Sequence, residues 1–295
     1  MPEGDTIFRA ARALGQALTG KVVTSFETAL AQLASVDDNQ PIAGRSIDRI
    51  EARGKWLLIY FSGDLILATH MLMSGSWHIY RTGERWRAPA RAMRAVLRTA
   101  DFEAVAFNVP LAKFFTARTL ARNSAIPALG PDLLGASFAA EDARPRILAR
   151  GDDEIANVLL NQRVMAGLGN VYKVEVCFLC GIHPFRKVST LTPAELDCVL
   201  HQSRRLILQN VQESSGDQIL TYTGARRTTG RADHGARLWA YGRQGEPCRR
   251  CGAAILMRKQ GPDARSTYWC PQCQPADSPV PGWANPSARK RVGCT

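Results

Sequence analysis

The stretch WLLIYFSGDLILATHMLMSGSWHIY, residues 56–80, contains three short runs of aliphatic, aromatic and β-branched residues separated by glycines. Runs of this composition that are bounded by glycine predict β-strands. The same pattern extends from about residue 22 to residue 115, with a further run at 105–107 and additional glycines at Gly54 and Gly83. We therefore expect a sandwich of two β-sheets in this part of the chain.

A helix is predicted directly before the sandwich, between residues 5 and 18. Apolar side chains recur there at helical spacing: Ile7, Ala10, Ala11, Leu14, Ala17 and Leu18. Asp5 or Thr6 is expected to cap the first turn, because either side-chain oxygen can accept a hydrogen bond from a free backbone N–H.

Pro2 and Glu3 precede this helix and indicate a catalytic N-terminus. The initiator methionine is normally removed before a small residue, which would leave the secondary amine of Pro2 beside a carboxylate. Such an amine forms a cationic iminium with an aldehydic carbon, and this electron sink promotes elimination. The positive end of the helix is expected to lower the pKa of the amine and so favour the neutral nucleophile near pH 7. The alternative is a Met-Pro start without catalytic meaning.

After the sandwich, a linker rich in proline and glycine is predicted at residues 126–150, and the chain then becomes helical. Helices are expected at 152–162, at 170–179, and from a capping box at Thr192 and Glu195 to about Val211. The sequence AGLGN, residues 166–170, lies between the first two. Its glycines fit either a turn that presents N–H groups and Asn170 to a phosphate or a plain turn between packed helices.

Four cysteines near the C-terminus have the spacing of a metal site, C-x2-C-x18-C-x2-C: Cys248, Cys251, Cys270 and Cys273. Two such pairs joined by a hairpin place four thiolates tetrahedrally around one structural Zn²⁺. Strands are expected at 254–259 and 266–269, joined by a turn at 260–265. Metal binding would supply the folding energy that so small a module cannot obtain from a core.

The other four cysteines are interpreted differently. Cys177 and Cys180 also form a C-x2-C pair, but they lie in an apolar run that predicts a buried helix, so we expect them to pack in a core. Cys198 and Cys294 have no partner at a recognisable spacing. Because no export signal is evident, a disulfide framework is not expected.

The charge of the chain points to a polyanionic partner. Lysine and arginine (38) exceed aspartate and glutamate (26), which gives a net charge of +12. Residues 204–295 contain 15 basic and 6 acidic residues, a net +9, and 13 of the 15 are arginines, which suit bidentate contacts to phosphate. Nucleic acid is the simplest partner, and a merely soluble basic surface is the alternative. The absence of a long apolar run or a signal peptide favours the cytoplasm, with no membrane partner.

Considered together, these motifs resemble the formamidopyrimidine-DNA glycosylase/endonuclease VIII family of base-excision repair enzymes. The matching segments occur in the order of the family: PEG (2–4), RGK (53–55), HMLMSGS (70–76), AGLGN (166–170), GIHP (181–184), YGR (241–243), and the cysteine module with Arg265. The resemblance spans residues 1–273.

The resemblance implies an α+β fold and a bifunctional glycosylase and AP lyase that removes oxidised bases from double-stranded DNA. Pro2 would attack C1′ of the damaged nucleotide, and Glu3 would be the acid/base at the sugar. Lys55 would assist β-elimination, and Arg265 would hold the adjoining phosphate and assist the second elimination. Asn170 would bind the DNA backbone, and Met73 would fill the space left by the extruded base. By composition alone, Lys55 is an ordinary solvated lysine and Met73 a core residue.

Three departures from the family bear on specificity. Thr6 stands where the family commonly has glutamate. The stretch FNVPLA, residues 107–112, lacks the arginine with which formamidopyrimidine-type enzymes contact the opposite base. Residues 226–231 replace the loop that covers oxidised purines in those enzymes. These departures favour an endonuclease VIII-like enzyme acting on oxidised pyrimidines. An oxidised-purine glycosylase and a catalytically silent zinc-containing DNA-binding protein are the alternatives.

The predicted organisation combines these elements in five parts. They are a catalytic β-sandwich with its N-terminal helix at 1–125, a linker at 126–150, a helix–two-turns–helix DNA-binding domain at 151–236, a four-cysteine zinc finger with a β-hairpin at 237–275, and a disordered basic tail at 276–295. We expect a monomer located in the cytoplasm, associated with the nucleoid if the source is bacterial.

Overall fold

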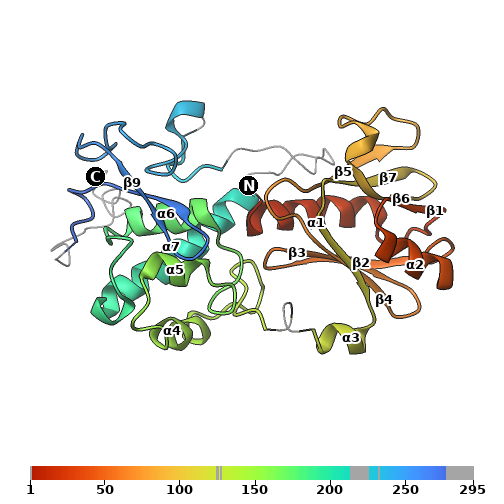
Figure 1. Ribbon diagram of the computed structural model, residues 1–295, viewed down its shortest axis with the longest axis horizontal. Helices are drawn as coiled ribbons and strands as arrows, with labels where there is room; N and C mark the ends of the chain where they lie inside the picture. The colour runs from red at the N-terminus through yellow and green to blue at the C-terminus, as the bar shows by residue number, and fades with distance from the viewer. Residues whose placement is uncertain (1, 124–125, 127, 213–225, 232, 277–295) are drawn as a thin grey trace, which may run out of the picture. The chain divides into compact units, whose positions relative to one another are not determined.

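The computed structural model describes residues 2–123, 126, 128–212, 226–231 and 233–276. The chain forms two compact units (Figure 1). The first comprises Met1–Ala143, Asn161–Gly169 and Arg204–Arg226, and the second comprises Arg144–Leu160, Asn170–Ser203 and Arg227–Thr295. Cys294 and most of the predicted basic tail lie outside the described residues. None of the described helices has the length and apolar character needed to cross a membrane.

The first unit is a sandwich of two antiparallel four-stranded sheets, as predicted. One sheet has the strand order β1-β6-β7-β5 and the other β2-β3-β4-β8. The elements are α1 (Gly4–Leu18), β1 (Ser25–Thr28), α2 (Ala31–Asn39), β2 (Ile47–Arg53), β3 (Trp56–Phe61), β4 (Leu65–His70), β5 (Ser76–Arg81), β6 (Met93–Arg98), β7 (Phe102–Phe107), β8 (Leu111–Phe115) and α3 (Ala117–Ala121). The predicted runs at 56–61 and 65–70 are therefore strands with the expected bounds.

Strand β3 is apolar throughout because both of its faces are covered. Leu57, Ile59 and Phe61 point into the core that is shared by the two sheets and α1. Leu58 belongs to a second buried cluster on the opposite face, where Ile126 also lies. A strand buried on both sides shows no alternation of polar and apolar residues, which explains the continuous run in the sequence.

Helix α1 packs into the main core through its predicted apolar stripe, which includes Ile7, Leu14 and Leu18. Its start differs from the prediction. Glu3 is the N-cap residue, and no side chain caps the helix. The N–H groups of Thr6 and Ile7 donate to the carbonyl oxygen of Glu3 at 2.9 and 3.1 Å. Asp5 and Thr6 lie inside the first turn, and both are buried by tertiary contacts, so neither side chain is a cap.

The predicted linker is partly helical. Helix α4 (Ala140–Leu148) occupies its last third and contains Pro145 in its second turn. A proline at this position removes one intrahelical hydrogen bond, which is why the sequence pattern predicts a break here. The carbonyl oxygen of Pro145 still accepts a hydrogen bond from Ala149 at 2.9 Å, so the helix continues past the ring.

The second unit contains helices and a β-hairpin, as predicted. The elements are α5 (Ile155–Leu160), α6 (Asn170–Leu179), the first half of α7 (Pro193–Gln212), β9 (Leu256–Gln260) and β10 (Arg265–Trp269). The capping box of α7 is confirmed: the N–H of Thr192 donates to Glu195 at 2.7 Å, and the N–H of Glu195 donates to the Thr192 hydroxyl at 3.2 Å. Helix α5 is shorter than the predicted 152–162.

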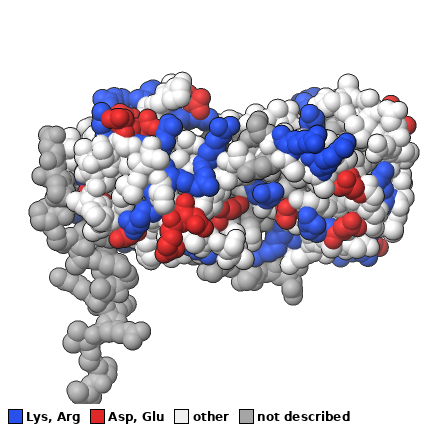
Figure 2. Space-filling view, turned by 90° about the horizontal axis from the view of Figure 1, so that it is seen from below, with Lys and Arg blue, Asp and Glu red and all other residues white. Residues whose placement is uncertain are grey.

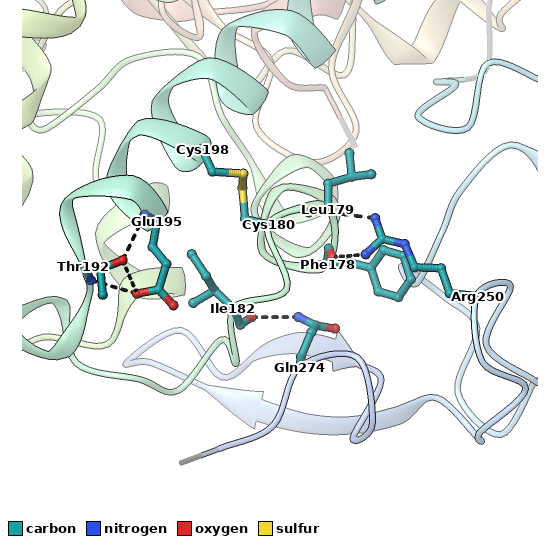
Figure 3. Close-up of a disulfide and its surroundings, with 9 residues drawn as sticks. All are labelled: Phe178, Leu179, Cys180, Ile182, Thr192, Glu195, Cys198, Arg250 and Gln274. Atoms are coloured by element: carbon teal, nitrogen blue, oxygen red, sulfur yellow. Dashed lines mark hydrogen bonds between the residues drawn. A yellow bond between two sulfur atoms is a disulfide. The ribbon is translucent and has the colours of Figure 1, made fainter. Parts of the chain in front are cut away.

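The interpretation of Cys180 and Cys198 was wrong, because the two residues form a disulfide (Figure 3). Cys180 follows the last residue of α6, and Cys198 lies on α7. Their spacing of 18 residues matches no recurring motif, and only the packing of α6 and α7 brings the sulfur atoms together. Cys177 is a buried free thiol, as expected, and burial raises its pKa to about 12.

Candidate functional site

Glu3 and Gly4, which directly follow Pro2, are held in the first unit by the glycines of the AGLGN turn. The Glu3 side chain is fully buried and accepts a hydrogen bond from the N–H of Gly169 at 3.0 Å. The N–H of Gly4 donates to the carbonyl oxygen of Gly167 at 2.9 Å. Pro2 is also buried. A carboxylate buried with a directed N–H donor has a fixed orientation, which an acid/base group requires.

Gly4 and Gly169 are both needed, because the backbone at Gly4 lies close to Gly167 and the Glu3 side chain lies close to Gly169. A Cβ on Gly169 would lie 2.4 Å from Cδ of Glu3, and a Cβ on Gly4 would lie 2.8 Å from Cα of Gly167. The turn is fastened from within by Gln162, whose side chain accepts from the N–H of Gly167 and donates to the carbonyl oxygen of Leu168. The N–H groups of Gly167 and Gly169 are thus used inside the protein. These two N–H groups therefore belong to a turn packed inside the protein, and they are not the phosphate-binding N–H groups that the sequence also allowed.

Lys55 follows a tight turn that the protein holds in place. Gly54 has a φ of 58°, and its N–H donates to Oδ2 of Asp132 at 2.6 Å. A Cβ on Gly54 would lie 3.2 Å from Cβ of Ala166, the first residue of the AGLGN turn. The turn that carries Lys55 therefore packs on the same segment that holds Glu3.

His70 ends β4 beside the start of β3. It is paired with Trp56, and the two rings meet edge to face at 5.0 Å. Burial and the nearby Lys55 ammonium lower the pKa of His70 to about 4. The ring is therefore neutral at pH 7, and its Nδ1 accepts a hydrogen bond from the N–H of Leu72 at 3.1 Å.

The turn between β4 and β5 exposes two apolar side chains. Met73, which the resemblance singled out, is 60% exposed, and Leu72 is 44% exposed with a φ of 44°. Neither residue packs in the core, so the core interpretation of Met73 was wrong. Leu72 was missed in the sequence, because an apolar residue inside a strand-rich run has no feature that marks it as exposed.

In the second unit, Asn170 lies next to the zinc hairpin. Its side-chain N–H group donates to the carbonyl oxygen of Ser266 at 2.9 Å. Ser266 follows Arg265, the first residue of β10, whose guanidinium lies 3.4 Å from the carboxylate of Asp263. Asn170, at the start of α6, and Arg265, on the hairpin, are thus neighbours. Both are predicted to contact DNA, and 95 positions separate them in the sequence.

Glu175 is a buried carboxylate in the same unit that sequence reasoning missed. It accepts hydrogen bonds from the N–H groups of Trp239, Ala240 and Tyr241 at 2.8, 2.9 and 2.9 Å, and from the hydroxyl of Thr228. Glu175 thus ties the segment before the zinc module to α6, and a lone glutamate in an apolar run gave no indication of this role.

The four predicted metal ligands come together. The Sγ atoms of Cys248, Cys251, Cys270 and Cys273 all lie within 4.8 Å of one another, with 3.9 Å between Cys248 and Cys273 and 3.4 Å between Cys251 and Cys270. Four thiolates around one Zn²⁺ with bonds of about 2.3 Å lie roughly 3.8 Å apart, so the cluster fits the ion. The module binds one structural Zn²⁺.

Side chains beside the zinc ligands join the module to α6 (Figure 3). Arg250, between the first two cysteines, donates to the carbonyl oxygens of Phe178 and Leu179 at 3.3 and 3.5 Å and lies over the Phe178 ring at 4.6 Å. Gln274 donates to the carbonyl oxygen of Ile182 at 2.8 Å. The last carbonyl groups of a helix lack intrahelical hydrogen-bond donors. Here Arg250 of the metal module donates to two of these carbonyl oxygens.

Comparisons with known proteins agree with this arrangement. Residues 1–111 match the formamidopyrimidine-DNA glycosylase N-terminal domain, residues 129–221 match the formamidopyrimidine-DNA glycosylase H2TH domain, and residues 245–276 match the zinc finger found in FPG and IleRS. A probable endonuclease 8 2 of Streptomyces coelicolor is 39% identical over 96% of this chain and 97% of its own length. The DNA-(apurinic or apyrimidinic site) lyase Nei2 of Mycolicibacterium smegmatis is also 39% identical, over 94% and 100%.

Among solved structures, the Fpg of Lactococcus lactis in complex with DNA that contains an abasic site has a TM-score of 0.77. The match covers 93% of this chain and 100% of that one, at 23% identity, and shows a shared fold. The chain belongs to the formamidopyrimidine-DNA glycosylase/endonuclease VIII family of bifunctional DNA glycosylases and AP lyases of base-excision repair, on its endonuclease VIII side. The resemblance seen in the sequence is confirmed.

Proposed function

We propose that this protein removes oxidised pyrimidines from double-stranded DNA and cleaves the strand at the resulting abasic site, with Pro2 as nucleophile. The observation that supports this most strongly is the buried Glu3 carboxylate. Gly169 orients it with a hydrogen bond of 3.0 Å, directly beside Pro2. A nucleophile next to an oriented acid/base group is the arrangement that covalent catalysis requires.

In the proposed reaction, the lone pair of the Pro2 nitrogen forms a bond to C1′ of the damaged nucleotide. The bond from C1′ to the base breaks, and the base leaves with its electron pair and takes up a proton from solvent. The Pro2 nitrogen gives up its proton, Glu3 donates a proton to O4′ as the bond from C1′ to O4′ breaks, and the ring-opened iminium remains. The iminium acidifies C2′. Loss of a C2′ proton then expels the 3′ phosphate, and a second elimination expels the 5′ phosphate. Hydrolysis of the remaining iminium returns the free amine.

Other side chains have supporting roles in this proposal. Lys55, fixed by the Gly54 turn, assists the first elimination as a cation near the leaving phosphate. Met73 and Leu72 enter the space that an extruded base leaves in the duplex, because both are exposed and apolar. Asn170 and Arg265 hold backbone phosphates, and their proximity in the second unit supports a joint role.

The surface is suited to a DNA backbone. On the face drawn in Figure 2, Lys and Arg side chains gather in several groups, with Asp and Glu side chains among them. Binding by such groups depends strongly on salt, because phosphate contacts release counterions. We propose that the protein binds duplex DNA as a monomer and acts in the cytoplasm.

The nucleophile is tested by trapping with borohydride, which reduces an iminium to a stable covalent complex. The parent protein is expected to be trapped on DNA that contains an abasic site, and Pro2→Gly is expected to lower the trapping rate by roughly 100-fold or more. An intact-mass measurement should show a chain that lacks Met1. Retention of Met1, or equal trapping of the Pro2→Gly variant, would remove Pro2 from the mechanism.

Lesion preference is tested with duplexes that contain thymine glycol or 8-oxoguanine. The β7–β8 turn contains only Asn108, Val109 and Pro110, and none of them carries a charge that could read the opposite base. We expect thymine glycol to be excised faster by roughly tenfold or more, with little dependence on the opposite base. Faster excision of 8-oxoguanine would establish the purine-directed alternative and leave the glycosylase assignment intact.

A further inference from the structure

Asp5 is a buried carboxylate in the first turn of α1, two residues after Glu3. Its side chain is fully buried. Nε and Nη2 of Arg226 donate to Oδ1 of Asp5 at 3.1 and 2.9 Å, and Nη2 of Arg9 donates to Oδ2 at 3.2 Å. Both carboxylate oxygens therefore have cationic donors. Burying a carboxylate is costly unless it is paired in this way.

Thr6 takes part in the same cluster. Its hydroxyl accepts a hydrogen bond from Nη2 of Arg226 at 3.0 Å, so a single guanidinium group contacts both Asp5 and Thr6. At Thr6, this chain departs from the glutamate that is common in the family, and the carboxylate is found one position earlier. The threonine thus leaves room for Arg226 and adds an acceptor for it.

The cluster also fastens α1 to the end of α7. Arg9 donates to the carbonyl oxygen of Asn210 at 3.3 Å, and Arg12 donates to that of Val211 at 3.5 Å. Contacts from Asp5, Arg9 and Arg12, spread over about two turns, therefore hold one face of α1. Displacement of α1 along its axis would break these contacts together with the hydrogen bond from the N–H of Gly4 to the carbonyl oxygen of Gly167.

We propose that Asp5 and Arg226 are positioning residues for Pro2 and Glu3. Their ion pair locks the first turn of α1, whose N-cap is Glu3, and so sets the position of the Glu3 carboxylate and the Pro2 amine. This inference rests on the proposed function of Pro2 and Glu3. A misplacement of catalytic groups by about 1 Å slows catalysis by up to roughly 100-fold, even when the substrate still binds.

The test uses Asp5→Asn, Arg226→Gln and their double variant in the full-length protein. The matched control is Arg186→Gln, which breaks a similarly buried pair in the second unit, where Arg186 lies 2.6 Å from Glu195. We expect the single-turnover rate of base excision to fall about tenfold or more in each Asp5 or Arg226 variant, with the dissociation constant for DNA changed less than about twofold. The double variant should be no slower than the slower single variant.

Arg226→Lys separates geometry from charge, because lysine keeps the charge and lacks the planar fork. An intermediate rate is expected. Hydrogen exchange of the Thr6 and Ile7 amides measures the order of the helix start without any DNA, and it should accelerate in Asp5→Asn and Arg226→Gln but not in Arg186→Gln.

Unchanged exchange, or excision rates equal to that of Arg186→Gln, would overturn the positioning role. If instead the parent protein fails to excise or to be trapped, the proposed function is wrong, and the exchange measurement still decides whether the ion pair holds the helix start.

Discussion

Replacing Gly169 with alanine is expected to slow base excision by roughly 100-fold, since catalysis is sensitive to displacements of about 1 Å. The added Cβ would lie 2.4 Å from Cδ and 2.7 Å from Oε1 of Glu3. Contacts this short force one group to move, and the end of the Glu3 side chain is the part that can move. The N–H of Gly169 would then lose its alignment with the carboxylate. The rate is measured under single-turnover conditions with a duplex that carries thymine glycol.

Gly15→Ala is the control for this prediction. Gly15 lies inside α1, and the nearest atom to an added Cβ is 3.9 Å away. Alanine should therefore stabilise the protein by about 0.5–1 kcal/mol without a change in excision rate. Thermal unfolding of both variants separates the catalytic effect from a folding defect. An excision rate for Gly169→Ala within about threefold of the parent would show that Glu3 does not need this hydrogen bond.

The sequence allowed the fold to be predicted wherever local pattern and tertiary environment agree. Strands β3 and β4 are continuous apolar runs bounded by glycine, and the structure buries them on both faces. The zinc module is equally local, because the spacing of its cysteines determines which thiolates can meet. The capping box at Thr192 depends on residues three positions apart, and it too was predicted.

Contacts between distant segments could not be predicted in this way. Arg226 reaches Asp5 across 221 positions, and Glu175 binds backbone groups more than 60 residues away. The disulfide of Cys180 and Cys198 likewise depends on how two helices pack. In each case the residue type alone allows many partners, and only the folded chain selects one. The departure at Thr6 was visible in the sequence, but the contacts of Thr6 and Asp5 with Arg226 were not.

Loss of the zinc ion is expected to unfold the β9–β10 hairpin and to weaken DNA binding. Cys270 is fully buried, and Cys270→Ser removes one of four ligands from a site whose metal contributes roughly 10–16 kcal/mol of apparent folding energy in small zinc modules. Once the hairpin is disordered, Asn170 loses its bond to Ser266, and Arg265 loses its position. We expect zinc content to fall well below one ion per chain and the affinity for abasic duplex DNA to fall by at least about tenfold.

Cys177→Ala is the matched control, because Cys177 is also buried and belongs to a C-x2-C pair but lies outside the four-cysteine cluster. It should retain one zinc ion and near-parental affinity for DNA. Zinc is measured by elemental analysis and affinity by fluorescence anisotropy. All four cysteines of the cluster lie in the second unit, so the β-sheet signal of the first unit in circular dichroism should persist in Cys270→Ser. A zinc-free variant that binds DNA as tightly as the parent would mean that Asn170 and Arg265 do not depend on the hairpin for their contacts with phosphate.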